Sequence, residues 1–298
     1  MSTSSVQLGP GGVVQIGDPD NARPGAGFLD PAATITGNTA FPFSSGGTVR
    51  FAHSDASYQF ANRMNGPLEV VHGGSGKTVL TGSSGYTGKT SIVAGTLALS
   101  GSGSIASSGT IAVAAGAMLD VSLVSGTYRL AAGQVLEGAG TVAGDTVVAA
   151  GATVAPGTGA SVGTLLFQDD LTLLGKLSIS ISGSNASLVD LSGGTFTLGN
   201  ASVLAFTGDA PTAAAYVFAS YDALAGTFAS VEGGVPAGYH LVYNYLGGSQ
   251  MALVAVPEPA SLALVGMAGL SGLVWRTTRR TTRRSRRRAA GRRPSLPA

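Results

Sequence analysis

The chain has 298 residues, of which 11% are charged and 6% aromatic, with 46 glycines and no cysteine. The absence of cysteine excludes disulfides, thiolate metal sites and cysteine catalysis, and the many glycines favour short strands and turns over helices. The net charge of +2 combines +10 from residues 276–298 with −8 from residues 1–275, so the body is acidic and nucleic acid is not an expected partner.

Residues 1–45 are expected to be irregular. The segment contains Gly9-Pro10-Gly11-Gly12, Asp18-Pro19 and Arg23-Pro24-Gly25, and such combinations of glycine and proline interrupt regular structure. We therefore place the start of the ordered domain near residue 46.

A recurring Ala-Gly unit marks the domain expected over residues 46–255. A hydrophobic residue, any residue, alanine and glycine follow one another four times, ending at Gly95, Gly116, Gly133 and Gly151. These glycines are 21, 17 and 18 residues apart, near the lower end of the periods of repeat proteins. The spacing predicts a solenoid with one coil per unit.

Runs between the glycines alternate apolar and polar residues, which is the pattern of half-buried strands. In residues 176–182, Leu177, Ile179 and Ile181 alternate with lysine and serine, so the apolar side chains leave one face of the strand. A β-sandwich gives no reason for the recurring Ala-Gly unit, whereas stacked coils do. We predict an all-β fold, a right-handed parallel β-helix. The same alternation occurs in residues 96–99, 127–130 and 195–198.

The end of this domain has a different pattern. Residues 239–245 and 251–254 flank the turn Leu246-Gly247-Gly248-Ser249 and predict an antiparallel hairpin. A solenoid needs such a cap because its last coil otherwise leaves an unpaired edge.

Part of the domain has a recognisable repeat. Residues 80–97 begin Leu-Thr-Gly, continue through Tyr86-Thr87-Gly88 and end Ala94-Gly95-Thr96-Leu97. This order resembles the autotransporter-associated β-strand repeat, and the resemblance extends over roughly residues 73–254. It implies an exported, surface-exposed β-helix of the passenger type.

The C-terminal region has three parts in order. Val256-Pro257-Glu258-Pro259-Ala260-Ser261 precedes an apolar stretch, residues 262–275, and then the arginines. This order resembles the PEP-CTERM sorting signal over residues 256–280. The resemblance implies that an exosortase, a membrane enzyme of Gram-negative bacteria, recognises Pro257, Glu258 and Pro259 and cuts the chain near them.

The apolar stretch also predicts a short transmembrane helix on physical grounds. The two prolines prevent a helix from starting before Ala260, and the sixteen residues 260–275 span about 24 Å, less than the roughly 30 Å hydrocarbon core. Such marginal insertion suits a segment that is later removed. Insertion depends on Leu262, Leu264, Val265, Leu270, Leu273, Val274 and the interfacial Trp275, and cytoplasmic orientation of the basic end on Arg276, Arg279 and Arg280.

Two other interpretations of this region are less favoured. If residues 262–275 formed a buried core helix, the ten arginines that follow would lie directly beside a hydrophobic core. The arginine run as a nucleic-acid arm leaves the adjacent apolar stretch without a role. We expect residues 281–298 to form a disordered arginine-rich tail.

Asp169 and Asp170, with Lys176 nearby, form the paired carboxylates closest to a base. Polysaccharide-active β-helix enzymes use clustered acids, but catalysis requires groups that converge in space, and acids between two strands commonly mark turns. The histidines His53, His72 and His240 are isolated in sequence. We therefore predict no catalytic residue, no metal ligand and no cofactor.

The resulting functional expectation is a structural or interaction protein that is exported. It resides in the inner membrane as a precursor and then at the cell surface, on the outer membrane or in the extracellular matrix. Its expected partners are the exosortase, transiently the inner membrane, and extracellular polysaccharide. The alternatives are a carbohydrate-binding adhesin and, less favoured, a polysaccharide-active enzyme that uses Asp169, Asp170 and Lys176.

Overall fold

The computed structural model describes residues 5–18, 29–30, 32–37, 46–159 and 161–257. The chain divides into two compact units, Met1–Val254 and Ala255–Ala298, and the described residues belong almost entirely to the first. They form strands throughout, with one short 3-10 helix, η1 (Tyr245–Gly247). The predicted all-β class is confirmed.

Three sheets contain the strands of the described residues, and nearly all neighbouring strands are parallel. The first sheet has four strands: β1 (Ser5–Leu8), β3 (Thr34–Gly37), β6 (Arg63–Gly66) and β9 (Gly85–Tyr86).

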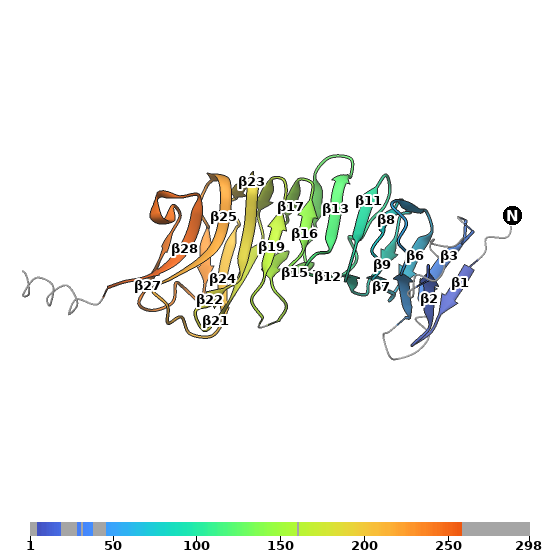
Figure 1. Cartoon of the computed structure of the whole chain (residues 1–298), viewed down its shortest axis with the longest axis horizontal. Helices are drawn as coiled ribbons and strands as arrows, with labels where there is room; N and C mark the ends of the chain where they lie inside the picture. The colour runs from blue at the N-terminus through green and yellow to red at the C-terminus, as the bar shows by residue number, and fades with distance from the viewer. Residues whose placement is uncertain (1–4, 19–28, 31, 38–45, 160, 258–298) are drawn as a thin grey trace, which may run out of the picture. The chain divides into compact units, whose positions relative to one another are not determined.

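The second sheet is a single column of strands from successive coils of the described residues. Short β22 (Asn185–Ala186) adds to it by antiparallel pairing with β21. The column contains, in order, β2 (Val13–Ile16), β4 (Thr48–Phe51), β7 (Glu69–His72), β10 (Thr90–Ile92), β12 (Thr110–Val113), β15 (Val135–Gly138), β18 (Thr153–Pro156), β21 (Lys176–Ser182), β24 (Val203–Gly208) and β26 (Ser230–Glu232). Figure 1 labels β2, β7, β12, β15, β21 and β24 among them.

The third sheet consists of two columns joined by one long strand, β23 (Leu188–Leu198), which pairs with β19 through its first half and with β20 through its second. One column contains β5 (Tyr58–Phe60), β8 (Lys77–Leu80), β11 (Thr96–Ser100), β13 (Met118–Leu123), β16 (Thr141–Ala143) and β19 (Thr164–Phe167). The other contains β14 (Tyr128–Leu130), β17 (Thr146–Val148) and β20 (Leu171–Leu173). Beyond β23 follow β25 (Ala215–Ala225), β28 (Gln250–Ala255) and β27 (Tyr239–Val242).

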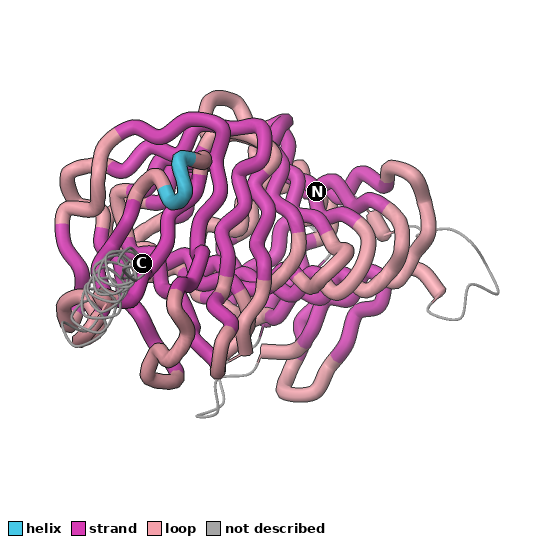
Figure 2. Tube along the Cα trace, turned by 60° about the vertical axis from the view of Figure 1, so that its left-hand side comes forward, coloured by secondary structure: helices cyan, strands magenta, loops and turns pink. Residues whose placement is uncertain are grey.

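This topology is a parallel β-helix, as predicted. Successive strands of one column stack with their side chains in register, and Figure 2 shows the strands of neighbouring coils running alongside one another. The inward side chains form continuous ladders: Ile111, Leu136 and Val154 are direct neighbours, and none of the three is exposed to solvent. One large apolar cluster extends from Leu8 to Met251, and a smaller one consists of Ile181, Tyr216 and Leu253.

The Ala-Gly units do not mark one coil each. Gly95 and Gly116 follow β10 and β12, at the turn that leaves the second sheet, whereas Gly133 and Gly151 follow β14 and β17, at the turn that enters it. The Gly133 N–H donates a hydrogen bond to the Gly151 carbonyl at 2.9 Å. The units ending at Gly133 and Gly151 therefore stack on each other, as those ending at Gly95 and Gly116 do, but the two pairs of units do not stack on one another. The true coil length, measured between ladder partners from Ile111 to Leu204, varies between 18 and 27 residues.

Three strands lie among the described residues of the segment that was expected to be irregular. β1 and β3 pair with each other, and β2 pairs with β4 in full register. The glycines and prolines of this segment lie between strands, where they permit turns. Ordered coils therefore begin well before residue 46.

The expected closing hairpin is present. β27 and β28 are neighbours, and β28 pairs antiparallel with β25, aligning Tyr216 with Leu253. Because β28 runs antiparallel to the strands of the coils, the stack of parallel strands ends here. This antiparallel strand provides the cap that a solenoid requires.

Candidate functional site

The last strand anchors the point at which the chain leaves the folded unit. Met251, Ala252 and Leu253 of β28 are fully buried. The Tyr216 hydroxyl accepts the Thr212 and Ala213 N–H groups and donates to the Gly183 carbonyl. The fold is therefore fixed up to residue 254, and Val256 is already 51% exposed.

The predicted sorting residues begin directly after this anchor. Pro257 lies two positions beyond β28 and outside any strand. None of the helices in the described part of the chain has the length and apolar character to cross a membrane. The other predicted residues of the signal lie outside the described residues: Glu258, Pro259, Leu262, Leu264, Val265, Leu270, Leu273, Val274, Trp275, Arg276, Arg279 and Arg280.

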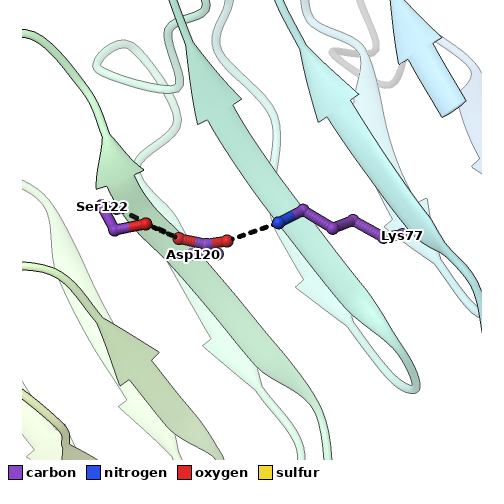
Figure 3. A network of polar contacts seen from close by, with 3 residues as sticks. All are labelled: Lys77, Asp120 and Ser122. Atoms are coloured by element: carbon purple, nitrogen blue, oxygen red, sulfur yellow. Dashed lines mark hydrogen bonds and ion pairs between the residues drawn. The ribbon is translucent and has the colours of Figure 1, made fainter. Parts of the chain in front are cut away.

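The three lysines of the chain each form an ion pair with an acid two coils further on. Nζ to carboxylate oxygen distances are 2.7 Å for Lys77–Asp120, 2.9 Å for Lys89–Glu137 and 2.6 Å for Lys176–Glu232. We call these pairs the lysine bridges. Figure 3 shows the first of them, in which the Lys77 side chain crosses the intervening strand to reach Asp120.

The same register produces all three lysine bridges. In each bridge, the residue two positions after the lysine pairs with an alanine on the next strand of the sheet. That alanine in turn pairs with the acid on the strand after it. That alanine is Ala98 in β11, Ala112 in β12 and Ala205 in β24. An alanine leaves room for the lysine stem to lie across the sheet, because such stems cover apolar surface while the charged end stays polar.

Asp120 is the most enclosed acid of the three bridges, with a side chain 11% exposed. Burial opposes its ionisation, but the hydrogen bonds from Lys77 and Ser122 outweigh burial and hold the pKa of Asp120 below its usual value. The bridge therefore stabilises the fold at neutral pH, and this contribution is lost as the pH falls through the folded-state pKa.

Replacing Lys77 by methionine should lower the free energy of unfolding by about 1–2 kcal/mol, because the enclosed Asp120 carboxylate loses its charged partner. The matched changes Lys89→Met and Lys176→Met should cost only about 0.2–1 kcal/mol, since both pairs are more exposed. Methionine keeps most of the stem. Urea unfolding followed by circular dichroism gives the comparison, and equal costs at all three positions would contradict it.

Asp169, Asp170 and Lys176 do not form a joint site in the structure. Each carboxylate accepts a backbone N–H of a neighbouring coil at 2.7 Å, Asp169 from Gly144 and Asp170 from Thr195. Lys176 is paired with Glu232 instead. The two aspartates thus accept hydrogen bonds from backbone N–H groups at turns, as expected if they mark turns.

The C-terminal region matches a known family. Residues 255–280 match the family described as the PEP-CTERM protein-sorting motif, so the chain carries this motif at its C-terminus. The match includes every residue that the sequence singled out for sorting, from Pro257 to Arg280.

Part of the chain is distantly similar to an autotransporter adhesin. A stretch of 126 residues, 42% of this chain, is 29% identical to the "Adhesin BmaC autotransporter" of Brucella suis biovar 1 (strain 1330). The alignment covers 3% of the adhesin, so this chain corresponds to a small part of that protein.

Proposed function

We propose that this chain, which carries a PEP-CTERM sorting motif, is an exported structural or interaction protein of the cell surface or extracellular matrix. An exosortase processes it at the motif during delivery. The observation that supports this proposal most is the position of the motif: it follows the last strand of the β-helix, β28, without a further strand or domain between them.

The properties of the folded unit support a role in association. Parallel coils give a long, regular surface, and the described outer positions are mostly small and polar. In solenoids such extended surfaces commonly bind partners. Extracellular polysaccharide and other surface proteins are the partners we propose.

Processing is testable through the motif itself. In cells with the exosortase, the mature protein should have lost its C-terminal segment, whereas the chain with Pro257→Ala, Glu258→Gln and Pro259→Ala should keep its full mass and stay with the inner membrane. Intact-mass spectrometry of fractionated cells measures both. The matched control Pro294→Ala with Pro297→Ala changes two prolines outside the motif and should be processed normally.

The outcome that contradicts sorting is clear. If the unaltered chain has the same C-terminus in cells with and without the exosortase, the proposal fails.

A carbohydrate-binding adhesin is the second candidate, supported by the similarity to the autotransporter adhesin. Binding of the purified chain to glycans without turnover favours this function over a purely structural one. Release of reducing ends that Asp170→Asn abolishes would instead favour the enzyme alternative.

A further inference from the structure

Two of the three histidines of the chain are buried among its first coils. His53 follows β4 and is 2% exposed, and His72 is the last residue of β7 and is inaccessible to solvent. In the ladder of the second sheet, His72 lies between Phe51 and Ile92. It occupies an interior position that neighbouring coils fill with apolar side chains.

Hydrogen bonds define which nitrogen carries the proton in the neutral form of each ring. The Ala94 carbonyl lies 2.8 Å from His72 Nδ1 and can only accept, so Nδ1 carries the proton. In the neutral ring His72 Nε2 is then a lone-pair nitrogen, and it is buried without a hydrogen-bond partner. The Asp55 N–H donates to His53 Nδ1 at 3.2 Å, so His53 Nε2 holds the proton and donates to Thr78 Oγ1 at 2.7 Å.

A second proton has no favourable position on either ring. On His72 it would add a buried N–H without an acceptor. On His53 it would replace the bond from the Asp55 N–H. The two ring centroids are 5.9 Å apart, so two imidazolium charges would also repel each other in a medium of low dielectric constant.

The ionisable groups around the pair only partly offset these costs. The Asp55 carboxylate lies 3.9 Å from His53 Nδ1, and the Tyr58 ring packs against His53. His53 also lines a polar cavity of about 310 Å³ together with Asp18 and Arg50, although its side chain is not exposed to solvent. Lys77, which precedes Thr78 on β8, is bound to Asp120.

The balance of these effects favours the neutral rings. Burial lowers the pKa of both histidines below the ordinary value. Asp55 acts in the opposite direction on His53, as the Ala94 carbonyl does on His72, while His53 lowers the pKa of His72 further.

We propose that His53 and His72 form an acid-operated latch, in which protonation at mildly acidic pH opens the coils containing β4, β5, β7 and β8. Opening gives both rings water and counter-ions, and it exposes the buried rings of Phe51 and Phe60. The coils from β12 onward contain neither histidine and stay folded, because each solenoid coil depends mainly on its immediate neighbours.

The direction of the pH dependence follows from proton binding. The unfolded histidines take up protons below about pH 6.5, whereas the folded pair resists them, so stability is complete above that pH and falls as the pH is lowered. At pH 5 a histidine that stays neutral when folded shifts the opening equilibrium by up to about 30-fold.

Hydrogen exchange of the full chain in non-ionic detergent tests the latch. Between pH 7.5 and pH 5, after correction for intrinsic rates, peptides from residues 46–80 should lose protection about tenfold or more, and peptides from residues 135–257 should not. The variant H53Q/H72F, with Gln in reach of Thr78 and an apolar ring at the Phe51–Ile92 ladder position, should abolish the loss. His240→Gln, at the exposed histidine of β27, should leave it unchanged.

Each result decides the proposal. Unchanged protection of residues 46–80 at pH 5 in the unaltered chain overturns it, as does the same loss in H53Q/H72F. Should that variant fail to fold, exchange of the histidine C2 protons in the unaltered chain replaces it. His53 and His72 must then titrate below the ordinary histidine value of about 6.5, and titration of both at that value overturns the latch.

Discussion

Replacing Gly138 by alanine should lower the free energy of unfolding by about 3–5 kcal/mol, one of the largest effects of a single methyl group in this chain. Gly138 ends β15 with φ +124°, a conformation that L-residues avoid. A Cβ atom there would lie 2.0 Å from the Val113 carbonyl oxygen of the coil before. Gly138 also exchanges two backbone hydrogen bonds with Gly157, so neither neighbouring coil can move away without further loss.

Gly116→Ala is the matched control for this prediction. Gly116 also has positive φ, +78°, but nothing lies within 4 Å of the position that an added Cβ atom would occupy. Gly116→Ala should lower the free energy of unfolding only by the cost of placing an L-residue at positive φ, about 1–2 kcal/mol. Denaturant unfolding of the two variants measures the difference, which combines the close approach of two coils with the less accessible φ of Gly138. Equal losses would show that backbone conformation, and not packing, governs Gly138.

Local patterns in the sequence were sufficient to predict the fold class and several strands of the region after residue 46, but not the strands before it. Residues 176–182 form β21 with the predicted bounds, and Leu177, Ile179 and Ile181 are all buried. The prediction succeeded because alternation has a period of two and is contained within one strand. The closing hairpin was predictable for the same reason, since the turn and both strands lie close together in sequence.

The path of each coil could not be predicted from the Ala-Gly units. A coil has several corners, and each can use a glycine with positive φ. Gly116 and Gly133 look equivalent in sequence, yet they lie at different corners. Turn chemistry specifies a turn but not its place in the coil.

The polar contacts between coils were also beyond the sequence. Lys176 lies close to Asp170 in sequence but pairs with Glu232, because coil lengths decide which residues become ladder neighbours. The lysine bridges could have been found from the pattern of a lysine, an alanine and an acid at paired positions on three successive strands. That pattern can be recognised only when the register of the strands is already known. His72 could not be recognised as interior for the same reason.

Replacing Leu264 by aspartate should move most of the uncleaved precursor out of the membrane. Leu264 lies outside the described residues, so this expectation rests on transfer free energies. The leucines and valines of residues 262–274 together favour insertion by about 2–3.5 kcal/mol. One Leu→Asp change opposes it by about 3–4 kcal/mol, so the ratio of membrane-bound to unbound precursor should fall more than about 100-fold.

This experiment uses cells that lack the exosortase, because cleavage would otherwise remove the segment, and it measures the protein that resists carbonate extraction. Leu264→Ile is the matched control, since both side chains insert with similar free energy, and it should remain in the membrane. The marginal length of residues 260–275 makes the test sensitive: a long transmembrane helix would tolerate one carboxylate. Retention of L264D in the membrane at the level of the unaltered chain would show that the arginines or the folded unit hold the precursor there, and not the apolar segment.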